Sequence, residues 1–508
     1  MTRWARFGGG ATAVITLLSC APATVPSREA SPPSGLVPPA LESVAQSDIQ
    51  RDLFALASDS FRGREAGTLD ELRASVWLAD RAREAGLLPA GDDGTYFQFW
   101  PMRRIRISRD SRIRVGERVL ALDTEVVVTS PVAAKLDLPL VFVGEGREGD
   151  LGGVDIRGKA VAAVISRPAN PPSGFVSLRP FRYTLTAIRE RVAFLTGRGA
   201  SAVLLVSDSV ADSAWVFAGT TLGRGRYNID STGTDQLPTQ PPVLWLHSRM
   251  LETIRSASGS QRFVADVQVE SFLYPSVNVV ALVAGTDQTL RSEYVLYSGH
   301  QDHDGVRVAI AGDSIWNGAD DNATVSVALL AIGRAFAKQP GRRSALFVWH
   351  GAEERGLLGS RWFVNQPTVP RAAIVAVLNG DMIGRNHPDS ATLMGSQPPH
   401  RNSNALVRMA LEANEKVGRF SLDSSWDRPE HPEGWYFRSD HLPYARAGIP
   451  ALFFSTLLHP EYHTPRDEAA TIDVAKLTRM ARWMYATGWS VSNASSRPQI
   501  DEGFKLER

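Results

Sequence analysis

Tyr294-Val-Leu-Tyr-Ser298 is a short apolar run, and Gly299-His300-Gln301-Asp302 follows it directly. The run is rich in branched and aromatic residues, which is typical of a strand buried on both faces of a sheet. Three further runs have the same character, at residues 345–349, 374–378 and 451–454. Polar residues follow the carboxyl ends of these runs within a few positions. The pattern predicts several parallel strands whose ends share one functional edge.

Helical patterns separate the predicted strands. Apolar residues recur at helical spacing within 325–336, after an Asp-Asp-Asn start suited to an N-cap, and again within 406–417. Strands that alternate with helices indicate an α/β fold with a doubly wound, mostly parallel central sheet flanked by helices. Ligand sites of such sheets lie beyond the carboxyl ends of the strands.

Five segments near these ends carry histidines and carboxylates. They are Gly299-His300-Gln301-Asp302, Gly318-Ala319-Asp320-Asp321-Asn322, Ala352-Glu353-Glu354-Arg355-Gly356, Asn379-Gly380-Asp381-Met382 and Tyr462-His463-Thr464-Pro465. Imidazole and carboxylate ligands suit zinc rather than a thiolate-type site. Two divalent cations commonly share a carboxylate, and a carboxylate that binds neither ion can accept a proton from water. The set therefore predicts a hydrolytic site for two metal ions.

The order of these segments resembles the zinc exopeptidases of metallopeptidase family M28, which include bacterial leucyl aminopeptidases, aminopeptidase Y and the glutamate carboxypeptidases. Ser439-Asp440-His441 and Ala447-Gly448-Ile449-Pro450 match a further stretch typical of that family. The resemblance covers roughly residues 41–115 and 263–490. It implies the zinc-exopeptidase fold, which is phosphorylase/hydrolase-like.

The resemblance also implies a ligand set for two zinc ions, with cobalt or manganese as possible substitutes. His300 and Asp381 would bind one ion, Glu354 and His463 would bind the other, and Asp320 would bridge both.

Further roles follow from the same resemblance. Glu353 would be the general base, and Tyr462 would donate a hydrogen bond to the oxyanion of the reacting carbonyl. Asp302 would orient the ring of His300 from outside the ligand set, and Asp321 would follow Asp320 through a cis peptide bond. Asp440 and His441 are possible substrate contacts. The remaining nearby histidines, His303, His350 and His459, are interpreted as loop or packing residues.

The first 40 residues differ from the rest. Basic Arg3 and Arg6 precede an apolar stretch, which predicts an export signal over 1–20. Leu17-Leu18-Ser19-Cys20 resembles a bacterial lipobox and contains the one cysteine of the chain. We therefore expect a lipidated Cys20 that anchors the protein in the bacterial cell envelope, at the outer membrane. Residues 21–40, rich in Pro, Ser and Ala, are expected to form a flexible tether.

The remaining chain divides into four parts. Residues 41–115 are expected to begin the peptidase domain and 263–492 to form its zinc-binding core, followed by a tail at 493–508. The segment 116–262 contains strand-like runs and resembles a protease-associated domain, a β-rich insert. This segment either acts as a spacer or narrows the access to the predicted metal site, so that only chain ends and short peptides enter.

Composition is that of a globular protein: 508 residues, 43% hydrophobic, 21% charged, net charge +1. This balance gives no argument for nucleic acid as a partner. The partner implied by the resemblance is a peptide substrate.

An aminopeptidase is the activity that the resemblance favours, and a carboxypeptidase or dipeptidase with the same metal site is the alternative. Acidic and basic residues both occur within 424–440, so charge there does not decide between a bound amine and a bound carboxylate. A glutaminyl cyclase and a non-catalytic binding module are the remaining alternatives.

Overall fold

The computed structural model describes residues 37–171, 179–230 and 240–507. The predicted signal segment, Cys20 and most of the tether lie outside these residues and stay predictions. The chain is already packed at the end of the predicted tether, where the Tyr485 hydroxyl donates to the carbonyl of Pro39 at 2.6 Å. None of the described helices is both long and apolar enough to cross a membrane.

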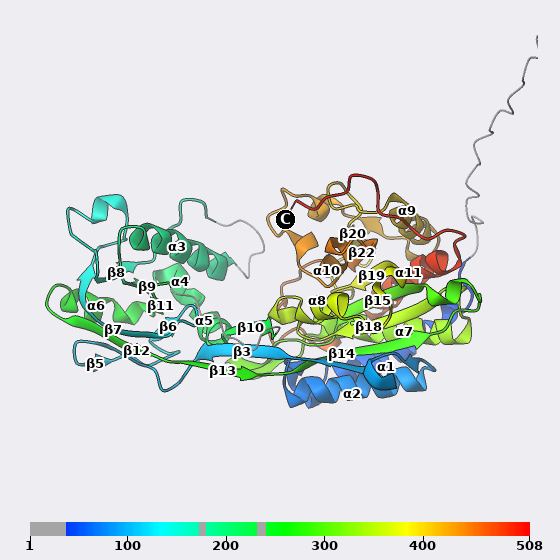
Figure 1. The fold of residues 1–508 in the computed structure, drawn as a ribbon, viewed down its shortest axis with the longest axis horizontal. Helices are drawn as coiled ribbons and strands as arrows, with labels where there is room; N and C mark the ends of the chain where they lie inside the picture. The colour runs from blue at the N-terminus through cyan, green and yellow to red at the C-terminus, as the bar shows by residue number, and fades with distance from the viewer. Residues whose placement is uncertain (1–36, 172–178, 231–239, 508) are drawn as a thin grey trace, which may run out of the picture. The chain divides into compact units, whose positions relative to one another are not determined.

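A nine-stranded sheet forms the centre of the main body, by which we mean residues 37–101 and 274–507 (Figure 1). The four apolar runs form its four central strands, in the order β18 (Ser344–His350), β15 (Tyr294–His300), β19 (Ile374–Gly380) and β22 (Ala451–Ser455). These four are parallel. The strands outside them are β1 (Leu88–Pro89), β2 (Phe97–Trp100), β14 (Ser276–Val283), β20 (Ser390–Met394) and β21 (Ser421–Leu422). The joining pairs β14–β18 and β20–β22 are antiparallel, so the parallel character is confined largely to the centre.

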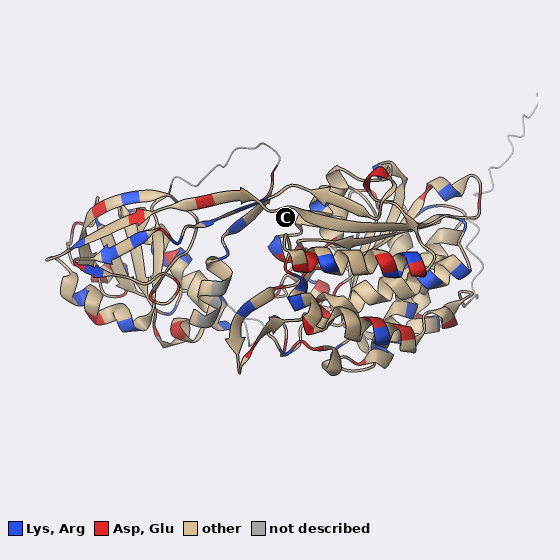
Figure 2. Cartoon of the chain, turned by 90° about the horizontal axis from the view of Figure 1, so that it is seen from below, with Lys and Arg blue, Asp and Glu red and all other residues tan. Residues whose placement is uncertain are grey.

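Helices cover both faces of this sheet. Alternate residues of β15 point to opposite faces: Tyr297 packs in one apolar cluster and Leu296 in another. The first face is covered by α1 (Gln46–Leu56), α2 (Leu69–Glu84), α7 (Thr324–Lys338), α9 (Asn404–Ala413) and α11 (Val474–Asn493). The second face is covered by α8 (Leu358–Asn365) and α10 (His441–Arg446). Basic and acidic residues are interspersed along the helices of the main body (Figure 2).

A second sheet of eight strands forms the insert, residues 112–267. Its order is β5 (Arg118–Val119), β4 (Arg112–Val115), β12 (Arg262–Val267), β7 (Ala134–Phe142), β8 (Ala160–Val164), β9 (Ala202–Val206), β11 (Val243–Leu246) and β6 (Val126–Val128). The helices of the insert are α3 (Arg179–Thr196), α4 (Ser209–Ser213), α5 (Trp215–Leu222) and α6 (Leu251–Ala257). Separate apolar clusters lie on the two faces of this sheet, so the insert has its own core.

Three strands connect the insert with the main body. The chain leaves through β3 (Met102–Ile107) and returns through β13 (Val269–Leu273). β3 is the middle strand of the three and pairs with both β13 and β10 (Arg226–Ile229) (Figure 1). The insert sheet begins with β4 at Arg112, before the boundary predicted at 116. A small hairpin of the main body, β16 (Gly305–Ile310) and β17 (Asp313–Trp316), follows β15.

Arg64 joins segments that lie far apart in the sequence. Its side chain is wholly buried, and its guanidinium donates to the carbonyls of Gln301 (2.7 Å), Leu56 (3.1 Å), Asn317 (2.7 Å) and Gly318 (2.9 Å). Burial lowers the pKa of Arg64 to about 10, so the side chain stays charged at neutral pH. Three of the four carbonyls, those of Gln301, Asn317 and Gly318, lie in or directly beside the polar segments 299–302 and 318–322. Arg64 therefore has a structural role in holding those segments.

We expect Arg64→Met to lower the free energy of unfolding by roughly 3 kcal/mol or more, because buried carbonyls that lose their donor cost about 1–3 kcal/mol each. Urea denaturation followed by circular dichroism measures the change. Arg62→Met is the matched control, since Arg62 lies in the same turn with its side chain 52% exposed. Equal losses in the two variants would contradict the role given to Arg64.

Candidate metal centre and the cavities beside it

The parallel strands bring the predicted segments to one edge of the sheet. His300 ends β15, Asp381 follows β19 directly, and Glu353 and Glu354 form a short turn after β18. Since β15 pairs with both β18 and β19, the carboxyl ends of the three strands are neighbours. The loop before α7 and the loop after β22 add Asp321 and His463 to this edge.

Two groups of side chains meet there. The first contains His303, Asp321, Glu354 and His463, and the second contains His300, Asp321 and Asp381; within each group the candidate ligand atoms lie within 4.8 Å of one another. His463 Nε2 is 3.1 Å from Asp321 Oδ2, and His300 Nε2 is 3.2 Å from Asp321 Oδ1. The two oxygens of Asp321 therefore face different groups, as a bridging carboxylate would.

The ligand atoms fit a divalent cation. Five of them are buried without a hydrogen-bond partner among the described residues: His300 Nε2, His303 Nδ1, Glu354 Oε1, Asp381 Oδ1 and His463 Nε2. Buried polar atoms without partners cost free energy, and their convergence on a common point is what a bound cation relieves. A set of nitrogen and oxygen donors suits zinc.

The bridging position was predicted for Asp320, but the structure gives it to Asp321. The Asp320 carboxylate instead accepts the N–H of Gly384 at 2.7 Å, and it belongs to neither group. The cis peptide bond lies between Asp321 and Asn322, one residue later than predicted. The cause is the buried carboxylate of Asp467, which accepts the N–H of both aspartates and fixes the direction of each side chain.

Asp302 acts differently from the prediction. His300 Nδ1 is 2.9 Å from the backbone carbonyl of Asp302, whereas the Asp302 carboxylate is 3.8 Å from that nitrogen. The carboxylate accepts the N–H groups of Glu353 (3.0 Å) and Glu354 (3.3 Å). Burial raises the pKa of Asp302 to about 6. The residue thus orients the ring through its carbonyl and holds the Glu353–Glu354 turn through its side chain.

Asp304 supports the ring of His463. Its Oδ2 lies 3.3 Å from His463 Nδ1, on the side of the ring away from the ligand group. Burial raises the pKa of Asp304, but Arg307, His463 and Arg224 hold it well below its usual range. An ionised carboxylate behind a ligand imidazole fixes the ring and increases its basicity.

Glu353 stands beside both groups but belongs to neither. Its side chain is 11% exposed, and its Oε2 is 3.8 Å from His300 Nε2. Burial raises the pKa of Glu353 well above its usual range. The carboxylate lines a cavity of about 270 Å³ together with Leu357, Met382, Trp435 and Phe437.

Tyr462 also lies at the site and borders a cavity, whereas two predicted substrate contacts are buried. The Tyr462 hydroxyl accepts a hydrogen bond from Arg438 Nη2 at 3.0 Å and borders the cavity. Asp440 and His441 are both 0% exposed, and the ring of His441 stacks on Phe453 at 4.9 Å. Neither residue lines either of the two cavities beside the ligand groups, so their contact with a substrate stays a prediction.

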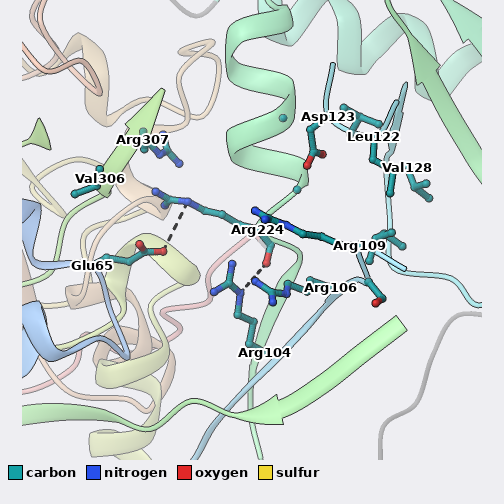
Figure 3. Close-up of a pocket in the computed structure, with 15 residues that line it drawn as sticks. Glu65, Arg104, Arg106, Arg109, Leu122, Asp123, Val128, Arg224, Val306 and Arg307 are labelled. Atoms are coloured by element: carbon teal, nitrogen blue, oxygen red, sulfur yellow. Dashed lines mark hydrogen bonds and ion pairs between the residues drawn. The ribbon is translucent and has the colours of Figure 1, made fainter. Parts of the chain in front are cut away.

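Glu354, Tyr462 and His463 also line a larger cavity of about 530 Å³. Its wall combines residues of the main body with residues of the insert, including Arg224, Arg226 and Tyr227. Arg224 Nη1 donates to Asp304 Oδ1 at 2.9 Å. Its Nε is 3.7 Å from Glu65 Oε1 (Figure 3). An adjoining cavity of about 270 Å³ has five arginines in its lining: Arg104, Arg106, Arg109, Arg224 and Arg307 (Figure 3).

Sequence reasoning missed three contributors to the site. His303 was interpreted as a loop residue, although its place directly after Asp302 put it beside a predicted segment. Asp467 and Arg224 carry no local signal, because each acts on a residue far away in the chain, over 147 and 80 positions respectively.

Residues 278–488 match the sequence profile of peptidase family M28. Curated relatives include aminopeptidase YwaD of Bacillus subtilis, 26% identical over 36% of this chain and 39% of that protein. A probable leucine aminopeptidase of Arthroderma benhamiae is 29% identical over 35% of this chain and 49% of its own. Leupeptin-inactivating enzyme 1 of Streptomyces exfoliatus is 33% identical over 27% and 29%. The chain thus spans less than half the length of each of these relatives.

Solved structures share the fold over most of the chain. An aminopeptidase from Aneurinibacillus sp. strain AM-1 superposes with a TM-score of 0.55 at 17% identity, covering 92% of this chain and 97% of that one. A zinc aminopeptidase from Bacillus subtilis gives a TM-score of 0.56 at 18% identity, with 91% and 98% covered. The mixed α/β fold is therefore shared with these two structures.

We expect Asp321→Asn to weaken metal binding at both groups and Asp320→Asn to leave it nearly unchanged. The reason is that a neutral amide at 321 removes the one carboxylate that the groups share. Inductively coupled plasma mass spectrometry of protein equilibrated with zinc and then desalted measures the bound metal. Loss of metal in the Asp320 variant alone would restore the original assignment.

Proposed function

We propose that the protein is a zinc-dependent exopeptidase with two metal ions, and that it removes amino-terminal residues from short peptides. One observation carries the proposal: two ligand groups share Asp321, and the carboxylate of Glu353 stands beside them without belonging to either. The family match over residues 278–488 and the aminopeptidase names of the relatives support it.

The ions would be held by five side chains that the sequence or the structure singles out. His300 and Asp381 would hold one, His463 and Glu354 the other, and Asp321 would contact both. Zinc in such a site supplies Lewis acidity toward a carbonyl oxygen and toward water.

Glu353 would move the proton. Its carboxylate would take a proton from the attacking water and deliver it to the leaving nitrogen. A carboxyl group whose pKa is raised by burial suits both halves of this task, because it can hold the proton between the two transfers.

Tyr462 would bind the carbonyl oxygen of the substrate. Its oxygen already accepts from Arg438, so its own hydroxyl hydrogen is left to donate. A donor aimed at the oxygen on which charge develops stabilises the transition state.

The larger cavity supports a short substrate with a free carboxylate. Four arginines line it, Arg224, Arg226, Arg307 and Arg355, against the carboxylates of Asp304 and Glu354. Glu354 would be neutralised by its metal, so the lining carries excess positive charge. The carboxy-terminal end of a di- or tripeptide is the group that would fit there. The same observation favours the second candidate, a carboxypeptidase or dipeptidase that uses the same ions.

Asp427, one of the acidic residues within 424–440, does not line the larger cavity. Asp427 is wholly buried and accepts the N–H groups of Gly395 (3.1 Å) and Gln397 (2.8 Å). We therefore assign Asp427 to the loop and not to substrate.

Glu353→Gln is expected to lower kcat by roughly 10²–10⁴-fold, since the amide cannot accept the proton. Bound zinc should stay at the wild-type level, because Glu353 lies outside both ligand groups. Peptide hydrolysis and metal analysis on the same preparation check the two expectations. Glu415→Gln, at an exposed glutamate, is the control. Full activity with bound metal would show that another group is the base.

Matched peptides separate the candidate activities. The purified protein with zinc would receive dipeptides and pentapeptides in free, N-acetylated and C-amidated forms, with products read by mass spectrometry. For an aminopeptidase we expect acetylation to abolish cleavage and amidation of the dipeptide to raise KM. Cleavage that survives acetylation and stops on amidation would establish a carboxypeptidase. Absence of cleavage in every set would point to a cyclase or a binding role.

A further inference from the structure

The first ligand group contains one imidazole more than the predicted set. We propose that His303 is itself a metal ligand, through Nδ1. The ion of the first group would then be held by the imidazoles of His303 and His463, and the ion of the second group by the imidazole of His300 alone. The proposal rests on the metal centre of the proposed function and adds a ligand to it. His303 is 0% exposed and lies in one group with Asp321, Glu354 and His463.

The distances around His303 are those of ligands on a common ion. Its Nδ1 lies 2.9 Å from Glu354 Oε1 and 3.9 Å from Asp321 Oδ2. His463 Nε2 lies 3.2 Å and 3.1 Å from the same two oxygens. Donors about 2.0–2.1 Å from a tetrahedral zinc stand about 3.3 Å from one another, and these four separations bracket that value.

A hydrogen bond does not explain the close approach of His303 to Glu354. At 2.9 Å the distance would allow one, yet both atoms lack a hydrogen-bond partner among the described residues. The ring N–H direction therefore misses the oxygen. A ring nitrogen and a carboxylate oxygen that lie this close, without the alignment of a hydrogen bond, suit two ligands that face a shared cation.

The surrounding backbone keeps the ring in this place. Gly318 packs against it so closely that a Cβ there would lie 2.3 Å from His303 Cγ. The N–H of His303 donates to the carbonyl of Arg64 at 3.4 Å. Asp302, the preceding residue, binds the N–H groups of the Glu353–Glu354 turn. The ring therefore cannot turn away without displacing two other segments.

The consequence is an asymmetric pair of sites. Two imidazoles and two carboxylates supply four ligands to one ion, whereas one imidazole and two carboxylates supply three ligands to the other ion. An additional nitrogen donor also favours zinc over oxygen-preferring ions such as manganese. We expect the ion beside His303 to bind more tightly and to exchange more slowly.

The test measures metal binding directly. Metal-free full-length protein would be titrated with zinc in competition with a chromophoric chelator. We expect two ions of unequal affinity in the wild type, and a loss of at least 10-fold at the tighter site in His303→Gln. X-ray absorption spectroscopy of the zinc-loaded wild type should find three imidazoles for two ions, and two in the variant. This second measurement on the wild type decides the matter even where the variant does not fold.

His400→Gln is the matched control, because His400 is also buried (2% exposed) but pairs with Asp427 outside the centre. It should keep both affinities. Two bound ions with unchanged affinity in His303→Gln, and two imidazoles in the wild-type spectrum, would overturn the role of His303 and leave the proposed function standing. A wild type that binds no zinc would overturn both.

Discussion

The guanidinium of Arg64 is the constraint on which the arrangement of the site depends. The polar segments that carry the candidate ligands are loops, and loops have no ladder of hydrogen bonds to fix them. Arg64 satisfies carbonyls at the end of α1, after β15 and before α7, so three segments are held by one buried cation. Asp302 and Asp467 hold neighbouring turns through their carboxylates in the same way. Charged side chains thus take the place of a backbone ladder in holding these loops.

The strands and the identity of the ligand segments could be predicted from the sequence. A strand buried on both faces leaves a continuous apolar run, which is a local signal, and parallel strands bring their carboxyl ends together without further information. The runs at 294–298, 345–349, 374–378 and 451–454 all lie within central strands. The short strands β1, β2 and β20 left weaker signals, whereas β14 is eight residues long and largely buried, and the prediction did not include it.

The choice between Asp320 and Asp321 could not be read from spacing. Adjacent side chains on an irregular loop point in different directions, and the direction here is set by Asp467, 146 residues beyond Asp321. The burial of Asp440 and His441 is equally non-local, since it results from packing between α10 and the sheet. His303 directly follows a predicted segment, but its role could not be predicted from that position. A loop histidine becomes a candidate ligand only when other segments, here those of Glu354 and His463, bring their ligand atoms close to its ring.

Residues 302–304 connect the two parts of the molecule. Asp302 holds the turn that carries Glu353, His303 faces the first ligand group, and Asp304 binds both the ring of His463 and Arg224 of the insert. The guanidinium of an insert residue is thus separated from a ligand imidazole by a single carboxylate. The wall of the larger cavity and the ring of His463 thus face one and the same anion. A change in the position of Arg224 would therefore change how much of the Asp304 charge is left to face that ring.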